Sequence, residues 1–169
     1  MDALAFKNYF TNRIILFLTN RLSIRFILFI LIAIWCTGIL SGSLFPDSVY
    51  AIIASPFLKK IYASVCHQHI EKSFFINGHY LLVCARCTGI YAGAFIISFI
   101  SLFSLHKLPA KMKLLYILSS PMFVDVVSTT MRIYPYSKII ALITGIFFGS
   151  AVFAYILAAL ENNFVDKSL

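Results

Sequence analysis

The sequence predicts an all-α integral membrane protein with four transmembrane helices, in which a long first extracytoplasmic loop carries a cysteine- and histidine-rich site. The first supporting observation is composition. Of the 169 residues, 61% are hydrophobic and only 12% are charged, and the mean hydropathy is +0.93. A soluble domain is typically about 45–50% apolar and about 25% charged, so the apolar excess of this chain is expected to face lipid. The second observation is that the apolar residues gather in runs near the length of about 20 residues that spans a bilayer.

The first expected span covers residues 22–41, an apolar run that begins near Arg25. Residues 42–87 follow as the long first loop. Within that loop, residues 48–65 form an apolar segment that is interrupted by a proline and closed by two lysines, which predicts an interfacial helix or, alternatively, a short re-entrant segment. Residues 1–21, before the first span, mix polar and apolar positions and are expected to form an amphipathic interfacial helix.

The second and fourth expected spans are rich in small residues. The second covers residues 88–105 and the fourth covers residues 139–160. In the fourth span, Gly145 and Gly149 form a Gly-x-x-x-Gly pair. Small residues let two helix backbones approach closely, and we expect this pair to serve packing within the chain rather than dimerisation.

The third expected span, residues 114–130, contains an acidic residue, Asp125, four positions after Pro121. A carboxylate inside a bilayer is costly and is by default a functional candidate. Asp125 is therefore a candidate catalytic residue that could complete a metal shell, orient a histidine ligand or act as a general base. The alternative is that it pairs with Arg132 or Arg86.

The charge distribution predicts the orientation. The net charge is +8, from 14 Lys and Arg against 6 Asp and Glu. The basic residues lie at the ends of the apolar runs, where they anchor helices, so the expected partner is the lipid bilayer and not nucleic acid. Their density is highest before the first span and between the second and third. The positive-inside rule therefore places both termini in the cytoplasm. We expect the multi-pass chain to lie in the cytoplasmic (inner) membrane of a prokaryotic cell. Nothing divides residues 1–169, which we treat as a single membrane domain.

The residues that carry chemistry lie between positions 66 and 87. Zinc favours four cysteine or histidine ligands, often in pairs on two segments, and a Cys-x-x-Cys can supply one pair. The expected zinc ligands are Cys66, His67, Cys84 and Cys87. Polar or aromatic neighbours that could support them are Gln68, His69, Glu71, Arg86, Thr88 and Tyr91. The fourth cysteine, Cys36, lies in the first span and is most simply a small buried hydrophobic residue.

Three functional hypotheses follow. A metal with an open position near Asp125 could activate water to hydrolyse a lipid-linked or membrane-embedded substrate, whereas a closed shell would be structural. Alternatively, Cys84 and Cys87 cycle between dithiol and disulfide, with Arg86 lowering a thiol pKa and Cys66 as the resolving thiol; a purely structural disulfide is also open. The third hypothesis is a non-enzymatic subunit or a small, oligomeric transporter with Asp125 as its ion site.

These residues resemble a family of small bacterial and archaeal membrane proteins of unknown function. The family is marked by a Cys-His-Gln segment followed by Cys-Ala-Arg-Cys-Thr-Gly-Ile-Tyr-x-Gly, which here are residues 66–68 and 84–93. A later proline and Asp125 also match. Two positions depart from the family's pattern, Lys72 in place of arginine and Val126 in place of glycine. The resemblance covers residues 60–150 and implies a set of residues worth testing, but it implies no biochemical activity.

Overall fold

A computed structural model of the protein describes residues 21–44, 49–104 and 112–164. In chain order the elements are α2 (Arg21–Leu44), α3 (Val49–Ala63), the 3-10 turn η1 (Ile70–Lys72), β1 (Ser73–Ile76), β2 (His79–Cys84), α4 (Ala85–Phe103), α5 (Met112–Thr130) and α6 (Lys138–Phe164). The amphipathic helix expected before the first span lies outside the described residues.

Four helices, α2, α4, α5 and α6, are each long and apolar enough to cross a membrane, which confirms the four expected spans. Their ends differ from the expectation by a few residues, since α2 continues to Leu44 and α6 to Phe164. The proline in the third span does not end α5. Pro121 leaves the carbonyl of Ile117 without its helical partner, and the hydroxyl of Ser120 donates to that oxygen at 2.9 Å. This bond offsets part of the cost of proline inside a helix.

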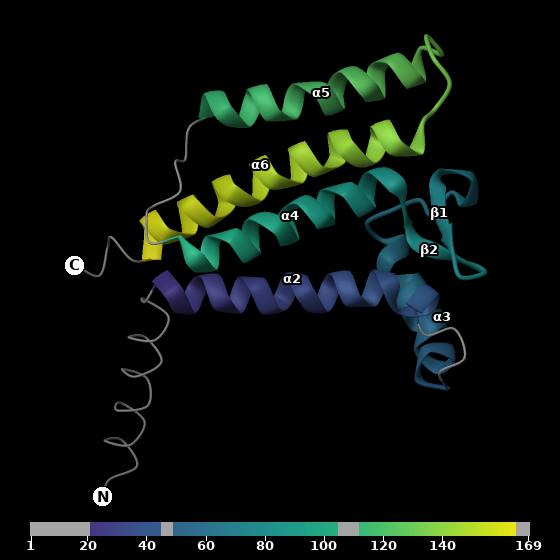
Figure 1. The fold of residues 1–169 in the computed structure, drawn as a ribbon, viewed down its shortest axis with the longest axis horizontal. Coiled ribbons are helices and arrows are strands. Elements are labelled where there is room, and N and C mark those ends of the chain that lie inside the picture. Colours follow the sequence, from purple (N-terminus) through teal and green to yellow (C-terminus); the bar gives the residue numbers. More distant parts are fainter. Residues whose placement is uncertain (1–20, 45–48, 105–111, 165–169) are drawn as a thin grey trace, which may run out of the picture.

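The four long helices lie side by side in the order α2, α4, α6, α5, as Figure 1 shows. Helix α3 and the β1–β2 hairpin gather at one end of the bundle, where α2 ends and α4 begins. The start of α2 and the end of α6 lie together at the opposite end. Residues 49–84 of the expected first loop therefore form a small folded layer at this end of the bundle.

Helices α4 and α6 pack backbone against backbone. A side chain added at Gly89 would collide with the backbone of Leu142 in α6, and one added at Gly149 would collide with the backbone of Ile90 in α4. Gly145 approaches α4 in the same way. The expectation that the Gly-x-x-x-Gly pair serves packing within the chain is confirmed, and the pair fixes the position of the first turn of α4.

The hairpin corrects the description of residues 42–87 as one loop. Ile76 pairs with His79 across a two-residue turn, in which Asn77 and Gly78 have φ angles of 50° and 80°. Asn-Gly is the preferred sequence for such a turn, because both positions need positive φ. The loop also ends earlier than expected, since α4 begins at Ala85 and so includes the second cysteine of the Cys-x-x-Cys.

Candidate metal centre

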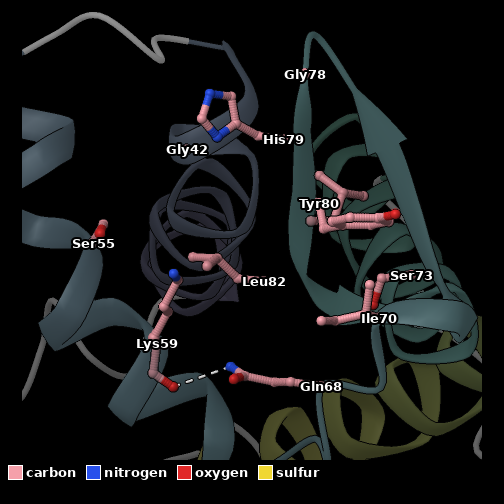
Figure 2. Close-up of a pocket in the computed structure, with 11 residues that line it drawn as sticks. Gly42, Ser55, Lys59, Gln68, Ile70, Ser73, Gly78, His79, Tyr80 and Leu82 are labelled. Atoms are coloured by element: carbon pink, nitrogen blue, oxygen red, sulfur yellow. Dashed lines mark hydrogen bonds between the residues drawn. The ribbon is translucent and has the colours of Figure 1, made fainter.

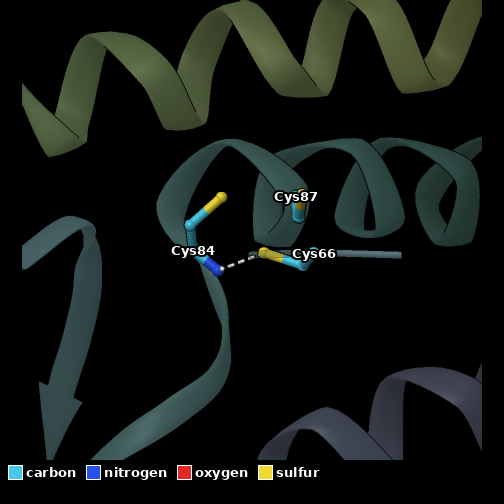
Figure 3. Close-up of side chains that lie close together, drawn as sticks. All are labelled: Cys66, Cys84 and Cys87. Atoms are coloured by element: carbon cyan, nitrogen blue, oxygen red, sulfur yellow. Dashed lines mark hydrogen bonds between the residues drawn. The ribbon is translucent and has the colours of Figure 1, made fainter. Parts of the chain in front are cut away.

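Three thiols meet at the amino-terminal end of α4 (Figure 3). Cys66 follows the end of α3, Cys84 is the last residue of β2, and Cys87 lies in the first turn of α4. Their sulfur atoms all lie within 4.8 Å of one another. In the part of the chain that the structure describes, no histidine or carboxylate belongs to this group.

The backbone explains why these cysteines converge. The amide of Cys66 donates to the carbonyl of Tyr62 at 2.9 Å, which closes the end of α3 and places Cys66 beside it. The hairpin then reverses the chain, and Ser73 pairs with Cys84. The amide of Cys84 donates to the sulfur of Cys66 at 3.3 Å, so a direct hydrogen bond joins the end of β2 to the segment that follows α3.

An apolar cluster surrounds part of the thiol group. Its buried members are Ile39, Tyr62, Cys66, Leu82 and Val83, and Trp35, Leu58, Cys84, Cys87 and Tyr91 pack against it. Cys66 is only 6% exposed, whereas Cys84 and Cys87 are half-buried. The hydroxyl of Tyr62 donates to the carbonyl of Trp35 at 2.8 Å, which ties α3 to α2 beside the thiols. The group is thus closed on the side of Cys66 and more open at the start of α4.

The electrostatic environment favours a thiolate at Cys84. The pKa of Cys84 is lowered to about 5, chiefly because the thiol of Cys87 hydrogen-bonds to its sulfur. The backbone amides of Cys87 and Arg86 and the thiol of Cys66 lower it further, while burial acts in the opposite direction. Amides at the start of a helix stabilise an anion in this way. Without a metal, Cys84 is therefore the thiol of the group whose ionisation the surroundings favour.

Asp125 is buried in α5 and forms an ion pair with Arg86. The Nη2 atom of Arg86 and the Oδ2 atom of Asp125 are 2.5 Å apart, and the hydroxyl of Tyr134 donates to Oδ1. Both carboxylate oxygens therefore have partners. The structure shows the pairing with Arg86 that was the alternative expectation for Asp125, and the catalytic role of Asp125 stays a prediction. Arg86 stands between Cys84 and Cys87 in the sequence, so the carboxylate is linked to the thiol group through this residue.

The two histidines beside Cys66 point into solvent. His67 and His69 are exposed, and their rings stack with centroids 6.3 Å apart and an interplanar angle of 4°. Between them, Gln68 has a φ of 48° and donates from its side-chain amide to the carbonyl of Lys59 at 3.0 Å. The structure therefore brings together three of the four expected ligands and leaves His67 outside the group.

The remaining supporting residues have different surroundings. The hydroxyl of Thr88 donates to the carbonyl of Cys84 at 3.1 Å, within the first turn of α4. The ring of Tyr91 lies 5.8 Å from that of Trp35, as part of the apolar cluster. Glu71 is exposed in the turn η1. Thr88 and Tyr91 thus support the site, and Glu71 lies at the surface.

Three cations make contacts between segments near the start of α4, and one of them, Lys138, was not singled out from the sequence. The ammonium of Lys72 lies 5.4 Å from the ring centre of Tyr136, and the guanidinium of Arg86 lies 5.9 Å from it. Lys138, at the start of α6, donates to the carbonyl of Ser73 at 2.8 Å. The Lys138 hydrogen bond joins β1 to α6, and the other two contacts bring Lys72 and Arg86 together at Tyr136, just before α6. They join segments far apart in the sequence, so the local pattern contains no signal for them.

A second buried ion pair lies at the other end of the bundle. The Nε atom of Arg25 in α2 is 2.6 Å from the Oε1 atom of Glu161 in α6. Sequence reasoning missed it because the expected fourth span stopped one residue before the glutamate. The sequence did contain a signal that the helix continues to Glu161. This residue lies four positions after Leu157 and therefore on the same face of the apolar helix.

Known proteins resemble this chain in sequence. An uncharacterized protein of Methanocaldococcus jannaschii is 38% identical over 104 residues, which cover 59% of this chain. An uncharacterized protein of Methanothermobacter thermautotrophicus is 58% identical over 31 residues, or 18% of this chain. The matched regions cover 66% and 28% of those relatives' own lengths. No solved structure matches the chain.

The model of one protein family matches residues 66–155, a region that contains the three thiols, the Arg86–Asp125 ion pair and the packed glycines of α4 and α6. That family is described as a predicted membrane protein, in agreement with the four apolar helices. The chain belongs to the DUF2085 family of membrane proteins.

Proposed function

We propose that the protein binds a divalent metal ion, most simply zinc, through the thiolates of Cys66, Cys84 and Cys87. The observation that carries this proposal is the mutual distance of the three sulfur atoms, all within 4.8 Å. Zinc–sulfur bonds of about 2.3 Å in a tetrahedral arrangement place the sulfurs about 3.8 Å apart. The group needs only a small contraction to reach that geometry.

The surroundings support metal ligation in two further ways. The amide of Cys84 already donates to the sulfur of Cys66, and such bonds hold a thiolate ligand in place. Three thiolates also leave a fourth position on a tetrahedral ion, which is the pattern of catalytic rather than structural zinc. A water molecule there would be activated by the metal, and a lipid-linked or membrane-embedded substrate is the proposed class for its hydrolysis.

The metal content of purified protein tests this proposal. We expect about one zinc ion per chain by elemental analysis, and loss of that ion on Cys66→Ser, Cys84→Ser or Cys87→Ser substitution. Cys36→Ser is the matched control, because the thiol of Cys36 lies in α2 and bonds to the carbonyl of Tyr91. Protein that carries no stoichiometric metal while its thiols remain reduced would refute the proposal.

The expected fourth ligand, His67, has its own test. The ring is exposed and stacked on His69, so His67→Ala should leave the zinc content unchanged and the fourth position open to water. Loss of zinc in this variant, with His69→Ala as the control, would show that His67 turns inward when the metal binds. In that case the shell is closed, and a structural role replaces the catalytic one.

A second candidate function is thiol–disulfide exchange by Cys84 and Cys87. The observation in its favour is that the Cys-x-x-Cys begins a helix, with Cys84 as the residue before the first turn. Helix starts favour reactive thiolates, and Cys66 lies close enough to act as the resolving thiol. Thiol trapping in growing cells separates the two functions. Redox exchange requires both oxidised and reduced forms to be trapped, whereas a metal centre keeps all three thiols reduced.

We further propose that the metal centre faces the outside of the cytoplasmic membrane, with both termini in the cytoplasm. Support comes from the denser basic residues near the start of the chain, and from α2 beginning and α6 ending at the same end of the bundle. Labelling of a single cysteine introduced at exposed Lys60, on a background without the other cysteines, tests the orientation with an impermeant reagent. An ion-carrying role for Asp125 has less support, because Arg86 already balances its charge.

A further inference from the structure

A cavity of about 530 Å³ lies between the end of α2, helix α3 and the hairpin (Figure 2). Its volume is within the range of about 300–1,000 Å³ found for small-molecule sites. The proposed metal function does not use it. Leu82 separates the two sites, since its side chain lines the cavity and also belongs to the apolar cluster that buries Cys66.

The polar part of the cavity lining includes a cation and several hydrogen-bond donors. Lys59 supplies a positive charge, and the His79 ring and the hydroxyls of Ser55 and Tyr80 can donate. Figure 2 shows Lys59 and Gln68 near one end of the cavity and His79 near the other. Among the lining residues, all of which the structure describes, there is no carboxylate. This set suits an anion with several acceptor oxygens, such as a phosphate monoester.

The rest of the lining is apolar and lies near the end of a membrane span. Ile70 and Leu81 line the cavity together with Leu82, and Gly42 contributes from the last turns of α2. On α3, Ile53 and Phe57 are 70% and 69% exposed, which suits contact with the interfacial region of a bilayer. A ligand that reaches this cavity from the membrane surface would carry both a charged group and an apolar part.

We propose that this cavity binds an amphiphile with a phosphate monoester head group. The phosphate lies against Lys59, at the Gln68 end of the cavity, and the apolar part lies against Ile70 and Leu82. The site is independent of the metal centre, because none of the three thiols lines it. Free phosphate offers the same anionic group as this amphiphile but has no apolar part. Contact with the apolar wall of the cavity is therefore what would make the lipid bind more tightly than the inorganic ion.

Native mass spectrometry of the full chain in detergent tests this proposal with three probes: dihexanoyl phosphatidic acid, dihexanoyl phosphatidylcholine and inorganic phosphate. We expect one phosphatidic acid to bind per chain more tightly than either other probe. Lys59→Gln should weaken that binding about tenfold, because a charge-assisted hydrogen bond is lost. The substitution keeps the Gln68 contact, which uses the backbone carbonyl of Lys59. Lys60→Gln is the matched control, since Lys60 is exposed and does not line the cavity.

Three outcomes would overturn the proposal: equal weakening by Lys59→Gln and Lys60→Gln, equal affinity for inorganic phosphate and phosphatidic acid, or no preference for phosphatidic acid over phosphatidylcholine. His79→Gln, at the other end of the cavity, is a second control and should leave the binding of phosphatidic acid unchanged, whereas weakening equal to that of Lys59→Gln would contradict the placement of the phosphate. Helix content and zinc content are measured on every variant. Unchanged zinc with weaker lipid binding separates this site from the metal centre, and loss of zinc alone would bear on the metal proposal only.

Discussion

The Arg25–Glu161 ion pair offers a quantitative test of how the bundle is held together. The two side chains are only 4% and 1% exposed, and their nearest atoms are 2.6 Å apart. Arg25 also donates to the carbonyl of Ser101 at 2.7 Å and to that of Ser104, both at the end of α4. One arginine therefore connects α2 with α4 and α6.

Replacement of Glu161 by glutamine keeps the shape of the side chain and removes its charge. Removal of one partner from a buried ion pair typically costs about 3–5 kcal/mol, because the other charge stays buried without compensation. The carbonyls of Ser101 and Ser104 still accept from Arg25, so we place Glu161→Gln at the lower end, about 3 kcal/mol. Replacement of both Arg25 and Glu161 by methionine removes both charges and should cost less than about 1 kcal/mol.

Reversible unfolding in mixed micelles measures these free energies, and a cycle of the two single methionine variants and the double variant gives the coupling. We expect the sum of the single costs to exceed the double cost by at least about 2 kcal/mol. Glu71→Gln is the control, because Glu71 is exposed in the turn η1. If the two single costs add up to the cost of the double variant to within about 0.5 kcal/mol, the reasoning is refuted, because residues that do not interact behave in that way.

Three further predictions use the same unfolding assay. Asp125→Asn should lower the free energy of unfolding by about 1–2 kcal/mol, which is less than the effect of Glu161→Gln. The reason is that its partner Arg86 is 22% exposed, so water compensates part of the lost pairing. An effect equal to or larger than that of Glu161→Gln would contradict this ranking by burial. Gly149→Leu should cost about 2 kcal/mol or more because the side chain meets the backbone of α4, whereas Gly42→Ala, which meets open space, should have little effect. Gly78→Val should cost about 1–3 kcal/mol, because valine does not readily adopt the φ of 80°, and a cost near zero would argue against the tight turn.

The four apolar helices could be predicted from the sequence because each signal is local. A run of about 20 apolar residues has few alternatives to a transmembrane helix. The role of Gly149 was also predictable, because glycines four residues apart on such a helix form a smooth face that another backbone can approach. What these patterns do not contain is the neighbour of each helix, so the order α2, α4, α6, α5 came from the structure.

The hairpin was predictable and was missed. Asn77-Gly78 is the strongest short signal for a two-residue turn, and β-branched and aromatic residues flank it on both sides. The turn returns the chain to Cys66, so that Cys66 and Cys84, 18 residues apart in the sequence, can form a direct hydrogen bond from amide to sulfur.

The candidate site was predictable in its cysteines and less so in its charged residues. Cys-x-x-Cys requires its two thiols to be near each other, and a third cysteine in the same segment makes a common site the simplest arrangement. Sequence spacing does not determine which way a single side chain points. His67 adjoins Cys66 yet faces solvent, whereas Arg86 and Asp125 pair across 39 residues. Each of these outcomes depends on tertiary packing.

The contacts around the thiol group indicate a site that is held in place without a bound metal. Glycine packing fixes α4 on α6, the Arg86–Asp125 pair joins α4 to α5, and the Tyr62–Trp35 hydrogen bond joins α3 to α2. None of these contacts uses a thiolate. Zinc fingers, by contrast, unfold without metal because the ion supplies most of their folding free energy. Removal of the metal by a chelator should therefore leave the helix content and the unfolding free energy of the bundle nearly unchanged, and it should expose the three thiols to alkylation. Cooperative loss of helix on chelation would show that the metal organises the fold. A structural role for the metal would then be favoured over a catalytic role with an open fourth position.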